Sequence, residues 1–242
     1  MDLPELVLLV PVICLAGWVR GVTGFGGPLI LVPVLGFFYG PISAISTSML
    51  VDLSCNVGLL RTAWRHASRR VAASLIGGAI PTIPIGGYML LEFPPTVIAR
   101  IVYVLIGIFA IVLLLGWRAS TQLSPRQFFL VGTLNGVIVG ATSLGAAALP
   151  FLFSGHESAL RSRATFIVWA LFSALVGLTV VLVGGRVGAS ECWRALVLMP
   201  AYLIGTTAGN RFAGSVDDRL LRRIVLIVLL AMAVVGVVLN MR

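Results

Sequence analysis

A glycine-rich run at residues 21–28, Gly-Val-Thr-Gly-Phe-Gly-Gly-Pro, lies inside the first apolar stretch of this chain. Glycine loosens a helix and proline removes a backbone donor, so a helix that faces lipid gains nothing from such a run. Irregular backbone at membrane depth is stable only where protein surrounds it or where it lines a cavity, and broken helices of this kind form transport sites. The run therefore predicts a break in a helix at a binding site.

The chemistry that such a break supports is the binding of a small anion. Free backbone N–H groups and the positive end of the helix dipole face the ligand where the second half-helix begins, and hydroxyl groups add donors. Hydroxyl residues lie at the expected N-cap positions in both halves of the chain, and Pro28 falls in the first turn of the new helix. Close packing through small residues is the alternative role for the glycines. The candidate binding residues of the two breaks are Thr23, Gly24, Phe25, Gly26, Gly27, Thr142, Ser143 and Gly145.

Two charged residues lie within apolar segments. Arg20 precedes the glycine run, where its guanidinium can bind an anionic substrate or pair with another group of the protein. Asp52 lies near the middle of the second apolar segment and shares a helix face with Ser48 and Asn56. A carboxylate beside an anion site favours a proton-coupling role for Asp52 and Asn56, and a structural ion pair between Arg20 and Asp52 is the alternative.

Other polar and aromatic side chains complete the candidate set. Ser46 and Thr165, together with Thr47 and Trp169, can line the same site, although each also suits hydrogen bonding between helices. The two histidines lie in basic loops with no nucleophile or third ligand beside them, and the three cysteines have no metal-binding spacing. We therefore expect no catalytic residues, no metal site, no cofactor and no enzymatic activity.

The composition indicates the elements that must position these residues. The chain has 242 residues, of which 59% are hydrophobic and 10% are charged, and its mean hydropathy is +1.09. Soluble domains carry about 25% charged residues, so we expect an all-α, multi-pass protein of the cell inner membrane, in contact with lipid. The net charge of +9 comes from 17 arginines without a lysine. Most of them lie in short loops between apolar spans, which favours membrane orientation over nucleic-acid binding.

An internal repeat divides the chain into two transmembrane halves, residues 1–117 and 118–242. The apolar segments are expected at about 5–39, 43–60, 71–91, 99–117, 127–154, 164–183, 195–213 and 224–240. The first and fifth are too long for one straight helix, so each half contains one broken or re-entrant glycine-rich helix and three transmembrane helices. A shift of 119 residues pairs small residues in both halves: Gly17 with Gly136, Gly21 with Gly140, Thr23 with Thr142, Gly26 with Gly145, Pro81 with Pro200 and Gly86 with Gly205.

The arginine distribution bears on the relative orientation of the halves. If the first and fifth segments are re-entrant hairpins, the halves are inverted and most loop arginines lie on the cytoplasmic side, leaving only Arg100, Arg186, Arg194 and Arg242 outside. If both segments cross fully, the halves are parallel and the arginines divide almost evenly. The positive-inside rule therefore predicts inverted repeats, and a broken helix that crosses the whole membrane is the alternative.

Residues 17–33, Gly-Trp-Val-Arg-Gly-Val-Thr-Gly-Phe-Gly-Gly-Pro-Leu-Ile-Leu-Val-Pro, resemble the opening of the first repeat in the TauE/SafE family of membrane permeases. The second repeat and its proline–glycine pairs extend the similarity over almost the whole chain. The resemblance implies a secondary carrier of small sulfur-containing anions such as sulfite or organosulfonates. The second half departs from the family pattern, because residues 142–148 read Thr-Ser-Leu-Gly-Ala-Ala-Ala where the family has another glycine-rich turn.

Together these features predict a secondary transporter that binds a small sulfur anion at the membrane midplane, between the two broken-helix loops. Alternating access would move the two halves about that site, with a proton as the candidate coupling ion. A non-transporting membrane subunit and a channel-like anion pathway are the alternatives, and a homo-oligomer is left open.

Overall fold

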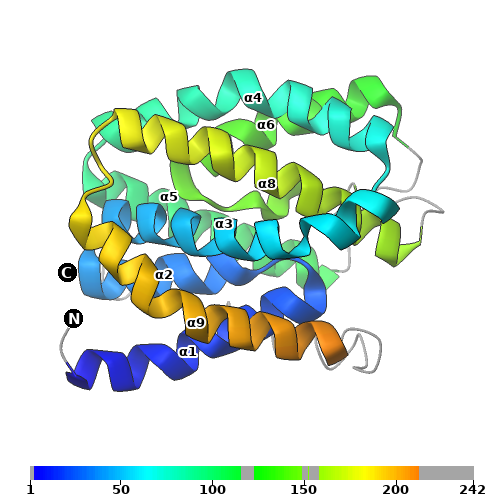
Figure 1. The fold of residues 1–242 in the computed structure, drawn as a ribbon. Coiled ribbons are helices and arrows are strands. Elements are labelled where there is room, and N and C mark those ends of the chain that lie inside the picture. The colour runs from blue at the N-terminus through cyan, green and yellow to red at the C-terminus, as the bar shows by residue number, and fades with distance from the viewer. Residues whose placement is uncertain (1–2, 116–122, 149–151, 153–157, 213–242) are drawn as a thin grey trace.

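The computed structural model describes residues 3–115, 123–148, 152 and 158–212, and these residues form helices and no strands (Figure 1). The α-helices are α1 (Leu3–Thr23), α2 (Gly27–Tyr39), α3 (Pro41–His66), α4 (Arg69–Glu92), α5 (Pro95–Leu115), α6 (Pro125–Thr142), α8 (Ala159–Val183) and α9 (Ala189–Phe212). A short 3-10 helix, η1 (Gly145–Ala148), follows α6. Five helices, α1, α3, α4, α5 and α8, contain stretches long and apolar enough to cross a membrane. The all-helical, multi-pass prediction is therefore confirmed.

Some helices extend further than the apolar segments predict. α3 continues to His66 and α8 begins at Ala159, so Arg161 and Arg163 lie in a helix instead of a loop. The Ser158 hydroxyl accepts a hydrogen bond from the N–H of Arg161 and thereby caps α8. Arginine is also a good helix former, and for these two reasons hydropathy alone places the helix start too late. The expected segment at 224–240 and the return limb of the second break lie outside the described residues.

The first helix break separates α1 from α2. α1 ends at Thr23, and the N–H of Gly24 donates to the carbonyl of Arg20 at 2.8 Å. Gly24 and Gly26 have φ values of 81° and 94°, in the left-handed region that glycine adopts without strain. Gly26 is the N-cap residue of α2, and Pro28 lies in its first turn. The expected break therefore forms, and the expected N-cap role of Thr23 is wrong because the glycine takes that position.

The second break repeats the hydrogen bonds of the first at the offset of 119 residues. The N–H of Ser143 donates to the carbonyl of Val139 at 2.8 Å, as Gly24 does to Arg20. The hydroxyls of Thr23 and Thr142 donate to the carbonyls four residues earlier, at 2.7 and 2.6 Å. Each hydroxyl also accepts from the backbone N–H two residues later, at 3.1 and 3.3 Å. Ser143 is the C-cap residue of α6 with φ 62°, and the half-helix that Thr142 or Ser143 was expected to cap lies outside the described residues.

Glycines allow two pairs of helices to pack with their backbones in contact. α1 packs along α9 and α4 packs along α6. A Cβ at Gly21 would overlap the carbonyl of Thr206, and one at Gly86 would overlap the carbonyl of Val137. α3 and α8 pack against each other between these two pairs (Figure 1). The described helices thus form a bundle with α3 and α8 at its centre, and Gly21 has the close-packing role that was the alternative to binding.

The hairpin formed by α1 and α2 begins and ends at one end of the bundle. The hydroxyl of Tyr39, at the end of α2, donates to the Glu5 carboxylate in the first turns of α1 at 3.1 Å. α3 and α9 also start at this end of the bundle. There the hydroxyl of Ser43 in α3 donates to the carboxylate of Glu191 in α9 at 2.6 Å. α6 starts from the opposite end, so α1 and α6 run in opposite directions (Figure 1).

Candidate functional site

A cavity lies between the two helix breaks. Its volume is about 40 Å³. One water molecule needs about 10–15 Å³ of such space, so the cavity has room for roughly three or four heavy atoms. Residues from both breaks line it together with residues from α1, α3 and α8. The lining residues are Arg20, Phe25, Gly26, Pro28, Leu29, Met49, Asp52, Val139, Ser143, Leu144, Gly145, Phe166, Trp169, Ala170, Ser173 and Ala174.

The cavity lies near the middle of the helices that surround it. Asp52 is about 16 Å along α3 from Pro41 and about 21 Å from His66, at 1.5 Å per residue. Tyr202 is about 20 Å along α9 from Ala189 and about 15 Å from Phe212. Both side chains are buried. The polar groups at this depth are therefore shielded from both ends of the bundle.

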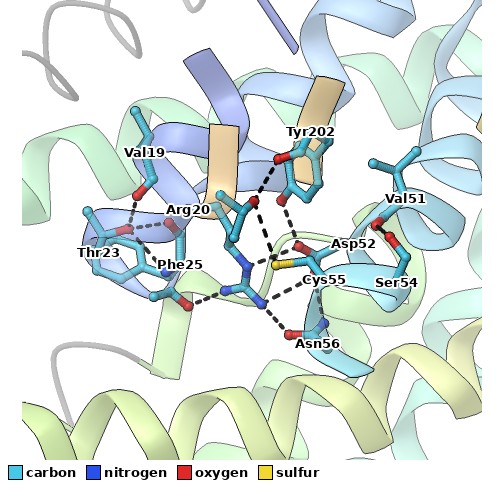
Figure 2. Close-up of polar contacts among 12 residues, drawn as sticks. Val19, Arg20, Thr23, Phe25, Val51, Asp52, Ser54, Cys55, Asn56 and Tyr202 are labelled. Carbon is cyan, nitrogen blue, oxygen red and sulfur yellow. Dashed lines mark hydrogen bonds and ion pairs between the residues drawn. The ribbon is translucent and has the colours of Figure 1, made fainter. Parts of the chain in front are cut away.

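Arg20 and Asp52 form an ion pair beside the cavity, with the arginine Nε 3.1 Å from Oδ1 of the aspartate (Figure 2). Asp52 also accepts hydrogen bonds from the hydroxyl of Tyr202 and the amide of Asn56, each at 2.9 Å. These groups come from α1, α3 and α9. The ion pair that was one of two alternatives for these residues is thus formed, and it connects three helices.

The remaining donors of Arg20 join the first break to α3. Its two terminal nitrogens donate to the Gly24 carbonyl, the Asn56 side-chain oxygen and, at 3.5 Å, Oδ2 of Asp52 (Figure 2). The Nε–H is close to Asp52 but is not aligned for a hydrogen bond. Three of the five N–H groups of the guanidinium are therefore used. Within the described residues, Arg20 keeps donor capacity at the cavity wall.

The cavity brings together seven of the predicted site residues: Arg20, Phe25, Gly26, Asp52, Ser143, Gly145 and Trp169. Asn56 lies behind them and holds Arg20 and Asp52. The others lie outside the lining. Gly24 packs under Arg163 and Gly27 packs against the Tyr202 hydroxyl. Four hydroxyls, those of Thr23, Ser46, Thr142 and Thr165, donate to carbonyls of their own helices.

Besides the Nε of Arg20, two buried donors at the cavity have no hydrogen-bond partner among the described residues. They are the indole Nε1 of Trp169 and the hydroxyl of Ser173, one turn apart on α8. Trp169 was a minor candidate from its aromatic character. Ser173 was missed as a site residue, although its pairing with Ser54 at the 119-residue offset and its position four residues after Trp169 were available signals.

Arg163 bounds the site on the α8 side. Its terminal nitrogen donates to the carbonyl of Gly21 and, at 2.9 Å, to the side-chain oxygen of Asn210. Its aliphatic part packs on Gly24, where a Cβ would overlap it. Arg163 therefore connects the end of α1 and the end of α9 to α8 next to the first break.

An all-helical membrane protein with a cavity at mid-helix depth, beside a helix interrupted by glycines, has the architecture of a transporter. The chain belongs to the TauE/SafE sulfite exporter family, whose sequence profile matches residues 9–235. This is a family of transporters and not of enzymes. The resemblance noted in the first break is thereby confirmed.

One curated relative is similar over most of both chains. It is a "Probable sulfite/organosulfonate exporter TauE" from Cupriavidus necator, 24% identical over 215 residues, covering 84% of this chain and 82% of the relative. No solved structure matches the chain.

Proposed function

We propose that this transporter is a secondary carrier that moves a small sulfur-containing anion, such as sulfite or an organosulfonate, across the inner membrane. The observation that carries the proposal is the cavity between the two breaks, at mid-helix depth, with the guanidinium of Arg20 at its wall. The N-terminus of α2, with its positive dipole end, opens on the same cavity through Gly26 and Leu29. The name of the relative from Cupriavidus necator supports this substrate class.

The two halves act in this proposal as inverted repeats about the cavity. Three observations support the repeat: the matching hydrogen bonds of the two breaks, the opposite directions of α1 and α6, and the way the first helix of each half packs on a helix of the other. At the offset of 119 residues, α1 corresponds to α6 and α4 corresponds to α9. The pair of α1 and α9 is therefore the counterpart of the pair of α6 and α4. Rocking of one half against the other would expose the cavity to each side in turn.

The arginine-rich helix ends orient the protein in the membrane. Arg65, Arg69, Arg126 and Arg161 lie at the ends of α3, α4, α6 and α8 that face away from Glu5 and Glu191. The positive-inside rule assigns this arginine-rich end to the cytoplasm. The N–H of Ser68 donates to the hydroxyl of Thr165 at 2.9 Å, which joins the start of α4 to the first turns of α8.

Proton coupling in this proposal acts through the pair of Arg20 and Asp52. A proton on the Asp52 carboxylate removes the negative charge that Arg20 faces, which frees the guanidinium to bind the anion. Loss of the proton restores the ion pair and releases the anion. Asn56 holds both partners in place through its amide, because it donates to Asp52 and accepts from Arg20.

Transport of sulfite into proteoliposomes that contain the purified chain tests the function. We expect saturable uptake that depends on a proton gradient, and Gly26→Ala should abolish it because φ 94° at this position strains any residue with a Cβ. Gly107→Ala on α5 is the matched control, since a Cβ there meets nothing within 4 Å. Uptake that rises linearly with concentration would indicate a channel-like pathway, and no uptake by the folded wild type would favour a non-transporting subunit.

A further inference from the structure

The indole of Trp169 and the hydroxyl of Ser173 are unused donors on the α8 side of the cavity. Trp169 is 1% exposed and Ser173 is 3% exposed, and both side chains line the cavity. The described part of the chain offers neither of them a hydrogen-bond partner. A buried donor without a partner costs about 1–3 kcal/mol, so a pair of them at one cavity indicates that another molecule supplies the acceptors.

The two donors lie on one face of α8. They are four residues apart, which places them one above the other along the helix, about 6 Å apart in rise. An oxyanion with several oxygens around one central atom presents acceptors to both groups at once. Arg20, across the cavity, keeps unused N–H groups for a further oxygen.

The ring of Trp169 has little freedom to move. It packs against the Phe166 ring, with centroids 5.3 Å apart, and against the second break, where a Cβ at Gly145 would lie 2.9 Å from Cζ3. A rigid ring directs its N–H without the entropy loss of ordering a mobile side chain. The second break therefore positions a binding donor through its contact with the ring.

The two threonine hydroxyls of the breaks are already used within the breaks themselves. Thr23 and Thr142 donate to Val19 and Ile138, and each also accepts from the N–H two residues later. Their hydrogen-bonding capacity holds the breaks in shape. The side-chain donors that line the cavity are those of Trp169 and Ser173 on α8, together with Arg20 and Ser143.

We propose that Trp169 and Ser173 bind the substrate directly, donating hydrogen bonds to two oxygens of a sulfite-sized oxyanion. The inference rests on the proposed function and deepens it by naming the recognition residues and the size class. The wall beside the donors is apolar, formed by Met49, Ala170 and Ala174. The cavity of about 40 Å³ accommodates roughly four heavy atoms, as in sulfite. Sulfite is therefore preferred over organosulfonates with longer chains.

Tryptophan fluorescence of the purified full-length chain, titrated with sodium sulfite, tests the assignment. We expect a saturable change in wild type that is lost in Trp169→Phe. The dissociation constant, measured independently by thermal stabilisation, should rise about 10- to 100-fold in Trp169→Phe and in Ser173→Ala, as for loss of a hydrogen bond to a charged group. Ser173→Thr keeps the hydroxyl and should bind more tightly than Ser173→Ala.

Matched controls separate binding from folding. Trp193→Phe removes a tryptophan that is 60% exposed, and Ser74→Ala removes an exposed hydroxyl that bonds only to its own helix. Both should bind sulfite as wild type does. Titration with methanesulfonate and then taurine should give progressively weaker binding.

Wild-type affinity for sulfite in both Trp169→Phe and Ser173→Ala would overturn the assignment and leave the proposed function intact. Tighter binding of taurine than of sulfite would overturn the size class. If the folded wild type binds none of these anions, the proposed function itself fails.

Discussion

Arg20 on α1 and Asp52 on α3 face each other at the centre of the bundle, with Nε 3.1 Å from Oδ1. Arg20 is 1% exposed, so its charge depends on this partner. The same guanidinium donates to the carbonyl of Gly24 in the first helix break. The ion pair is therefore connected directly to the break that lines the cavity.

A double-mutant cycle should show that the two charges depend on each other. We expect Arg20→Met and Asp52→Leu each to lower the free energy of unfolding by about 3–5 kcal/mol, because each leaves a buried charge without its partner. The double variant should be more stable than either single variant. Thermal or denaturant unfolding in detergent measures this, and strictly additive losses would contradict the coupling.

Asp52→Asn should flatten the pH dependence of anion binding. The amide carries no charge and so imitates the protonated carboxylic acid, leaving Arg20 free for the anion at every pH. Methanesulfonate is the suitable probe because it does not titrate in the working range. If Asp52→Asn keeps the pH profile of wild type, another group carries the proton.

Gly21→Ala should loosen the contact between α1 and α9. A Cβ at this position overlaps the carbonyl of Thr206, so the helices must separate, at a cost of about 1–3 kcal/mol. Gly58→Ala on α3 is the control, since a Cβ there meets nothing within 4 Å, and the better helix former should stabilise by about 1 kcal/mol. Equal unfolding temperatures for the two variants would contradict the packing argument.

Ser143→Gly should be tolerated or stabilising, in contrast to Gly24→Ala. The two positions correspond in the two breaks, and Ser143 has φ 62°, which favours glycine over serine by up to about 1 kcal/mol. Gly24 has φ 81°, and a Cβ there also overlaps Arg163. Unfolding temperatures of both variants test the equivalence of the breaks, and loss of folding in Ser143→Gly would disprove it.

Glu191, at the start of α9, should contribute stability that is lost in acid. Partial burial favours a higher pKa, but hydrogen bonds from Ser43, Ser190 and the Gly188 backbone outweigh it and lower the pKa from 4.5 to about 2. A lowered pKa stabilises the folded state above pH 4.5, and this contribution disappears as the pH falls towards 2. Wild type should unfold at a higher temperature than Glu191→Gln at pH 7, with the difference vanishing near pH 2. A constant difference across this range would contradict the assignment.

The helix breaks were predictable because their causes are local. Glycines at 24 and 26 and the proline at 28 dictate an interruption wherever the rest of the chain lies. The repeat offset also located the second break at 142–145, although that segment lacks most of the glycines. The N-cap assignment of Thr23 was wrong because a threonine can instead bond to the carbonyl four residues earlier in its own helix, as it does here.

The sequence alone determined the helical membrane class and the first helix break, since hydropathy, glycine and proline act over a few residues. Only the tertiary structure decided between a free and a paired Arg20, because Asp52 lies 32 positions away on another helix. It also decided which donors line the cavity. Thr23 and Trp169 were both candidates. The Thr23 hydroxyl donates to its own helix, whereas the Trp169 indole lines the cavity without a hydrogen-bond partner among the described residues. This difference depends on how α8 packs against the breaks. Long-range packing, which no local pattern encodes, selects the donors that line the cavity.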